Sequence, residues 1–175
     1  MKNLLIISST KNTNLDLSYE IKKYLDNYGN GEISILSLEE YDLPLYTPTL
    51  EEKFKQNNSF PDTIERVKKI LINSRAIIWC SPEYNGGISP IVTNTIAWIS
   101  RATEDWREAF KDKKILICSS SGGNGKNFIK GFRIQLDYLG SNVSEDYIIR
   151  TKKNGGDKDN FCLLYTSPSP RDSIR

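Results

Sequence analysis

The stretch SPEYNGG, residues 81–87, determines the interpretation of this sequence because of what stands on either side of it. It follows residues 75–80, an apolar run ending in Ile-Ile-Trp-Cys that is typical of a buried strand. It precedes residues 88–101, where apolar residues recur at helical spacing, with Ser89 as the expected N-cap and Pro90 at the first helical position. We therefore predict a loop at the carboxyl end of a strand, where ligands bind in open α/β sheets.

The residue types of this loop suit a flat aromatic ligand with polar edges. Pro82 stiffens the backbone, Tyr84 offers a face for stacking, and Asn85 offers both a hydrogen-bond donor and an acceptor. Gly86 and Gly87 leave backbone N–H groups open to close approach. An ordinary strand-to-helix turn uses the same residue types and remains an alternative.

A second loop of this kind, STKNTN at residues 9–14, follows a predicted central strand over residues 3–8. A helical pattern over residues 15–28 comes next, so the loop opens onto a helix N-terminus, which favours an anion. The alternative is a plain capping loop with Thr13 or Asn14 as the N-cap. Neither GxxxxGK[ST] nor GxGxxG is present.

A third loop, SSSGGNGK at residues 119–126, separates a predicted strand over residues 115–118 from a helix predicted over residues 127–139. Its small residues let the backbone approach a ring edge closely, although a flexible turn has the same composition. Further strands are predicted over residues 32–38 and 142–149, and a further helix over residues 61–73. Residues 39–60 form a long polar connection that we expect to flank the mouth of the site.

The composition of the chain limits the classes of function that it can have. The chain has 175 residues with 38% hydrophobic content, which fits one domain with a core, and its net charge of +2 calls for neither nucleic acid nor membrane. Histidine is absent, which excludes Ser-His-Asp and Cys-His nucleophile arrangements and the HExxH zinc site. Cys80, Cys118 and Cys162 lack metal-type spacing, so we expect no metal and a reducing, cytoplasmic compartment.

Residues 81–101, SPEYNGGISPIVTNTIAWISR, resemble the signature of the NADPH-dependent FMN reductase family, which has a flavodoxin-like fold. The shared pattern is P-E-Y-N-G, a helix start containing proline, and then N-x-x-x-W, which here falls on Asn94 and Trp98. The loop 9–14 resembles the family's phosphate loop, with Ser8 in place of the usual Gly and Lys11 in place of the usual Arg. The loop 119–126 resembles the family's S-x-G-G-x-G, and the resemblance extends over residues 2–150.

The resemblance implies an α/β, flavodoxin-like three-layer sandwich with a five-stranded parallel sheet of order 2-1-3-4-5. In that order strands one, three and four lie side by side, so their three loops should converge on one crevice. The resemblance implies FMN as the cofactor and no catalytic side chain, because the flavin carries the chemistry. The residues expected to bind FMN are Ser9, Lys11, Thr13 and Asn14 at the phosphate, Pro82, Glu83, Tyr84, Asn85 and Gly86 beside the ring, and Ser120, Gly122 and Gly123 on the other wall.

The function expected from this resemblance is an FMN-dependent oxidoreductase. NADPH or NADH would donate hydride, and the small-molecule electron acceptor would be a flavin, a quinone, an azo compound or a similar electrophile. A homodimer or homotetramer is expected to complete the pocket around the nicotinamide. The alternative is a non-enzymatic flavodoxin-like electron carrier or flavin-binding regulator, although carriers of that kind are usually strongly acidic.

The expected FMN-binding domain covers residues 1–160. Residues 161–175, FCLLYTSPSPRDSIR, show no periodicity and do not resemble the family. Part of this segment resembles a translated cloning or sequencing scar, and a disordered tail is the alternative.

Overall fold

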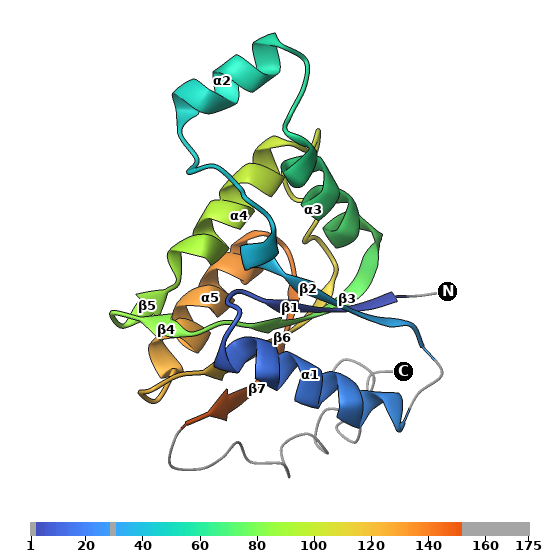
Figure 1. Ribbon diagram of the computed structural model, residues 1–175, viewed down its shortest axis with the longest axis vertical. Coiled ribbons are helices and arrows are strands. Elements are labelled where there is room, and N and C mark those ends of the chain that lie inside the picture. The colour runs from blue at the N-terminus through green and yellow to red at the C-terminus, as the bar shows by residue number, and fades with distance from the viewer. Residues whose placement is uncertain (1–2, 29–30, 152–175) are drawn as a thin grey trace, which may run out of the picture.

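A parallel sheet forms the centre of the molecule, as the computed structural model shows for residues 3–28 and 31–151 (Figure 1). The tail predicted at residues 161–175 lies outside these described residues. The elements, in chain order, are β1 (Asn3–Ser8), α1 (Thr13–Asp26), β2 (Ile33–Ser37), the 3-10 turn η1 (Leu38–Glu40), α2 (Pro48–Gln56), α3 (Asp62–Asn73), β3 (Ser74–Cys80), β4 (Glu83–Tyr84), β5 (Gly87–Ile88), α4 (Pro90–Arg101), β6 (Lys114–Ser120), α5 (Lys126–Tyr138) and β7 (Asn142–Arg150).

The strand order of the central sheet is β2-β1-β3-β6-β7, and every neighbouring pair is parallel. This confirms the predicted order 2-1-3-4-5. Parallel strands are joined by crossover connections, here through helices. After β2 is added on one side of β1, the next strands β3, β6 and β7 are added on the other side, so the order of strand addition reverses at β1. The carboxyl ends of β1 and β3 therefore lie at the switch point, with β6 next to β3.

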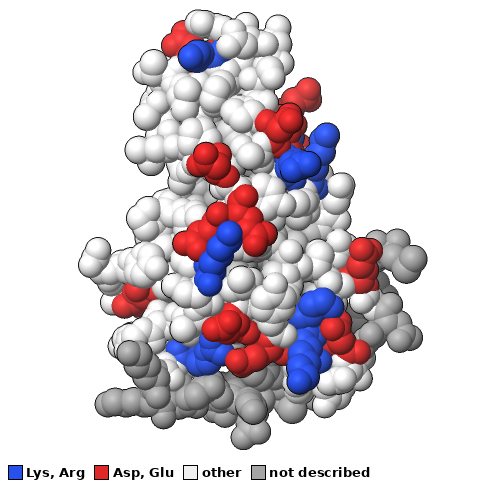
Figure 2. Space-filling view, in the orientation of Figure 1, with Lys and Arg blue, Asp and Glu red and all other residues white. Residues whose placement is uncertain are grey.

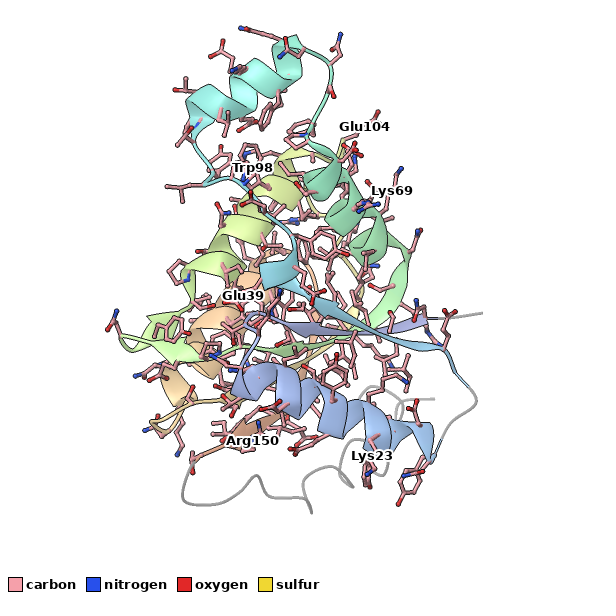
Figure 3. The ribbon with its side chains drawn as sticks, viewed as in Figure 1. Lys23, Glu39, Lys69, Trp98, Glu104 and Arg150 are labelled. Atoms are coloured by element: carbon pink, nitrogen blue, oxygen red, sulfur yellow. The ribbon has the colours of Figure 1, made fainter. Side chains whose placement is uncertain are left out.

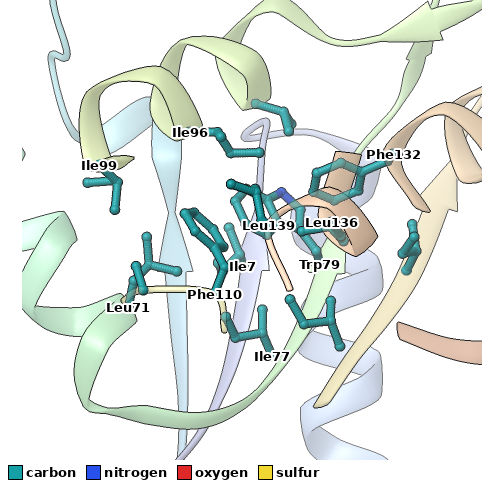
Figure 4. Packing of buried hydrophobic residues seen from close by; sticks show 14 of the residues in the cluster. Ile7, Leu71, Ile77, Trp79, Ile96, Ile99, Phe110, Phe132, Leu136 and Leu139 are labelled. Atoms are coloured by element: carbon teal, nitrogen blue, oxygen red, sulfur yellow. The ribbon is translucent and has the colours of Figure 1, made fainter. Parts of the chain in front are cut away.

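Two hydrophobic cores cover the two faces of the sheet, which gives the three predicted layers. On one face, alternate residues of the strands pack against α3, α4 and α5 (Figure 4). The rings of Trp79 and Phe132 meet edge to face there, with 5.1 Å between their centroids. On the other face, Ile6, Ile78 and Leu116 pack against the apolar side of α1. Strands buried on both faces explain the continuous apolar runs in the sequence.

The segment of residues 39–60 contains a helix that the sequence analysis missed. Thr47 caps α2 by accepting the Leu50 N–H at 3.2 Å, and Pro48 occupies the first helical position. This Thr-Pro pair is a local helix-start signal that could have revealed the element. In Figure 1, α2 lies at the top of the view, well away from β4 and β5, whereas Glu39 at the start of the segment contacts the first loop.

Acidic and basic side chains of the described residues are interspersed over the face shown in Figure 2. Within the described ranges, none of the helices has the length and the apolar content needed to cross a bilayer.

Candidate functional site

The stretch predicted as a loop after β3 is a short hairpin formed by β4 and β5. Glu83 pairs with Ile88 and Tyr84 with Gly87 in antiparallel register. Asn85 and Gly86 form the turn with φ values of 51° and 72°, which matches the left-handed backbone of the type I′ turn that Asn-Gly favours. The Asn-Gly pair was therefore the signal for this hairpin. The hairpin holds Tyr84 away from the central sheet, with 45% of the residue's surface exposed.

Glu83 connects this hairpin to the third loop and to α5. Its carboxylate accepts hydrogen bonds from the backbone N–H groups of Asn127 and Phe128, at 2.8 and 3.1 Å. These N–H groups belong to the first turn of α5. The N-cap residue of α5 is Gly125, which has no side chain that could accept hydrogen bonds from them. The Glu83 N–H in turn donates to Ser121 Oγ at 2.8 Å, so it is already engaged within the protein.

Asn14 connects the first loop to the third. Its buried amide makes two hydrogen bonds with the backbone of Ser120, Nδ2 donating to the carbonyl at 3.0 Å and Oδ1 accepting the N–H at 2.8 Å. The N-cap of α1 is Asn12, so the alternative that placed Thr13 or Asn14 at this position was wrong. Asn14 holds two walls of the site together.

The three loops meet around one pocket of about 460 Å³. This confirms the predicted convergence, and the volume lies within the range of small-molecule sites. Seven of the twelve residues proposed from the sequence line it: Thr13, Asn14, Pro82, Glu83, Tyr84, Ser120 and Gly122. The other five, which do not line it, are Ser9, Lys11, Asn85, Gly86 and Gly123.

Comparison with known proteins identifies the family. Residues 1–154 match the family described as NADPH-dependent FMN reductase. This chain belongs to the NADPH-dependent FMN reductase family. It is 24% identical, over 90% of its length and 92% of the relative's, to a Mycoplasma pneumoniae protein named as an uncharacterized MG342 homolog.

Two further relatives bear on the family's chemistry and fold. An NADPH:quinone oxidoreductase of Arabidopsis thaliana is 31% identical over 51% of this chain, and the matched region covers 43% of that protein. The structure of FerB, a flavoenzyme NAD(P)H:acceptor oxidoreductase from Paracoccus denitrificans, superposes with a TM-score of 0.67 at 20% identity, over 83% of this chain and 76% of that one. The fold is therefore flavodoxin-like, as the order of the strands in the sheet also indicates.

The family signature residues Asn94 and Trp98 hold the segment between η1 and α2 against α4. Both donate to the Pro44 carbonyl, at 3.0 Å from Asn94 Nδ2 and 2.6 Å from Trp98 Nε1, and Asn94 Oδ1 accepts the Tyr46 N–H at 2.7 Å. Trp98 is fully buried, lying between α4 and the segment that carries α2, where its ring packs against Phe54 (Figure 3). In this chain the two residues thus fix the segment before α2 and do not line the pocket.

Two residues of the first loop that were expected to bind phosphate differ in their access to solvent. Ser9 is fully buried, and its Oγ accepts a hydrogen bond from Trp79 Nε1 at 3.1 Å. Lys11 is exposed, and its backbone N–H donates to Glu39 Oε2 at 2.5 Å. Its ammonium group lies 3.9 Å from Glu40 Oε1. Lys11 remains accessible to a ligand, whereas Ser9 serves the core.

Arg150 is a pocket residue that the sequence analysis missed. Its guanidinium donates to Ser120 Oγ at 3.2 Å, to Glu20 Oε1 at 2.7 Å and to the Thr13 carbonyl. It lies at the end of β7, beside the first turn of α1 (Figure 3). The position of an arginine at the carboxyl end of a predicted strand was the available signal.

The cysteines and acidic residues offer no competing chemistry in the part of the chain that the structure describes. Cys80 and Cys118 are buried, and burial together with the hydrogen bond that the Cys118 thiol donates to Cys80 raises the pKa of this thiol well above its usual value. A neutral buried thiol is a poor nucleophile. The described residues contain no cluster of His, Cys, Asp or Glu suited to a metal ion.

Proposed function

We propose that this chain is an FMN-dependent oxidoreductase that uses NADPH or NADH to reduce a small-molecule acceptor such as a flavin, a quinone or an azo compound. The observation that carries the proposal is the convergence of three loops, after β1, β3 and β6, on one pocket of about 460 Å³ in a chain of this family. When bound, FMN would supply the hydride chemistry that the side chains lack.

Two features of the pocket fit a planar ring. Tyr84 presents an exposed aromatic side chain at the rim. Gly122 lines the pocket, and a Cβ added there would find no atom within 4 Å. Packing within the protein therefore does not require a glycine at this position, whereas the close approach of a ring would. Tyr84 and Gly122 would border opposite sides of the ring, together with Pro82, Asn85, Gly86 and Gly123.

One feature of the first loop fits a phosphate. The backbone N–H of Lys11 already donates a hydrogen bond to an anionic group in this structure, the Glu39 carboxylate, whose Oε2 lies 2.5 Å away. Lys11 and Thr13 would hold the phosphate, with the N-terminus of α1 favouring its charge. Asn14, Glu83 and Ser120 would act by fixing the walls of the pocket, since their contacts join one loop to another.

The proposal includes an assembly and a compartment. A second subunit of a homodimer or homotetramer would cover the exposed Tyr84 side of the pocket and leave a slot for nicotinamide. Cytoplasmic residence fits the buried, unpaired Cys80 and Cys118. Chemical crosslinking and sedimentation of the purified chain test the first of these.

A visible spectrum and a turnover assay test the function. We expect purified protein to bind FMN with a visible flavin spectrum that bleaches when NADPH or NADH is added without oxygen. Adding a quinone should then give repeated oxidation of the nicotinamide. Flavin binding without turnover on any acceptor would favour the carrier or regulator instead, and failure to bind FMN would refute the proposal.

A further inference from the structure

The turn after β2 places a carboxylate on the loop proposed to hold the FMN phosphate. Ser37, the last residue of β2, pairs with Ser8, the last residue of β1, so η1 and the first loop leave the sheet side by side. Glu39 on η1 therefore reaches the first loop from 28 positions further along the chain, and its Oε2 accepts the Lys11 N–H at 2.5 Å. Glu39 lies beside the turn between β1 and α1 in Figure 3.

This contact uses a donor that a phosphate at the same loop would need. A backbone N–H group bonds one anionic oxygen well, so a phosphate oxygen and the Glu39 carboxylate are alternatives at Lys11. Glu40 adds a second negative charge on the same turn, 3.9 Å from the Lys11 ammonium group. Both carboxylates also repel a phosphate that bears negative charge.

We infer that Glu39 is a specificity-determining residue that competes with the phosphate of the flavin for the first loop. The inference rests on the proposed function, because it assumes that FMN binds with its phosphate at residues 9–14. A phosphorylated ligand has to displace Glu39 before its phosphate can use the Lys11 N–H. The apparent affinity is then lowered by the fraction of molecules in which Glu39 occupies the loop. Riboflavin, which lacks the phosphate, does not meet this competition.

Binding titrations of the full chain, freed of flavin, test the inference with FMN and riboflavin as paired ligands. Glu39→Gln keeps the size of the side chain and removes its charge, and we expect it to tighten FMN binding about three- to tenfold. Riboflavin binding should change less than about twofold, because the ring contacts are untouched. A structural role for Glu39 predicts the opposite sign, since the loss of a useful contact weakens binding.

Glu40→Gln is the matched control, because it removes the same charge one residue away without touching the Lys11 N–H. Its exposed ion pair is of the kind that contributes little, so we expect less than about a twofold change in FMN binding. Glu39→Ala is a second variant with the same expected direction. Thermal unfolding of each variant shows that the fold is retained, as the exposed position of Glu39 leads us to expect.

The outcomes separate this inference from the proposed function. If the wild-type chain binds FMN and Glu39→Gln binds it equally or more weakly, the inference is wrong and the proposed function stands. Equal tightening of FMN and riboflavin also overturns it, because the effect would then not act through the phosphate. If neither flavin binds the wild-type chain or any variant, the proposed function fails and the inference fails with it.

Discussion

Replacing Asn14 by alanine should separate two walls of the pocket and lower the stability of the whole domain. The wild-type amide makes two buried hydrogen bonds with the Ser120 backbone, at 3.0 and 2.8 Å. Asn14→Ala leaves a buried N–H and a buried carbonyl without their partner, at a cost of about 1–3 kcal/mol for each. Because the pocket beside them admits water, we expect a total loss of about 2–4 kcal/mol, or roughly 5–15 °C in Tm.

Urea unfolding followed by tryptophan fluorescence measures this loss, since Trp79 and Trp98 are fully buried in the folded protein. Asn27→Ala is a matched control, because it removes the same amide from an exposed position where it makes one hydrogen bond, to the Lys23 carbonyl. The control should stay within about 0.5 kcal/mol of the wild-type chain. Asn14→Ala within that same margin would refute the account of the Asn14 amide as a structural clamp.

Asn14→Asp gives the same prediction a pH dependence. The protonated acid can still donate to the Ser120 carbonyl, whereas the ionised carboxylate would face that carbonyl oxygen without a proton. The folded pKa of the introduced acid therefore lies above its unfolded value of about 3.9. A group with a raised folded pKa stabilises fully below the unfolded pKa, and its contribution is lost as the pH rises through the folded pKa. Relative to wild type, the variant should be less stable at pH 7 than at pH 4, and an equal difference at both would contradict this.

Three further predictions follow from single contacts. Burial raises the pKa of the Glu51 carboxyl, but hydrogen bonds from Lys55 and Tyr46 outweigh this effect and hold the pKa below its usual value. Glu51→Gln should therefore lower the free energy of unfolding by about 0.5–1 kcal/mol at pH 7. That cost should shrink as the pH falls through the lowered folded pKa, which unfolding at pH 3 and pH 7 would check. Glu83→Ala should cost about 1–2 kcal/mol by uncapping α5, and Glu83→Gln, which keeps an acceptor, should cost less in the same urea titration. Gly122→Val should leave the unfolding free energy within about 0.5 kcal/mol of wild type yet weaken FMN binding more than about tenfold, and unchanged binding would show that the ring does not approach this residue.

Local sequence signals predicted most of the fold. The apolar runs of β1, β3 and β6 predicted central strands because a strand buried on both faces has no polar alternation. The loops after these strands were predicted to converge because parallel strands end at the same edge of a sheet, and the pocket that they form confirms this. The helix α2 and the hairpin β4–β5 were missed, although Thr47-Pro48 and Asn85-Gly86 are local signals for them.

The sequence by itself determined the fold class, the family and the three loops that meet, because these depend on residue types and their spacing along the chain. Only the tertiary structure decided which polar atoms of those loops remain available. It engages Asn14 with Ser120, 106 positions away, and brings Arg150 to Thr13 across 137 positions and Glu39 to Lys11 across 28. The chemistry of a side chain determines which groups it can bond. Its actual partner depends on which groups lie close to it in the folded molecule, and local sequence does not encode those distances.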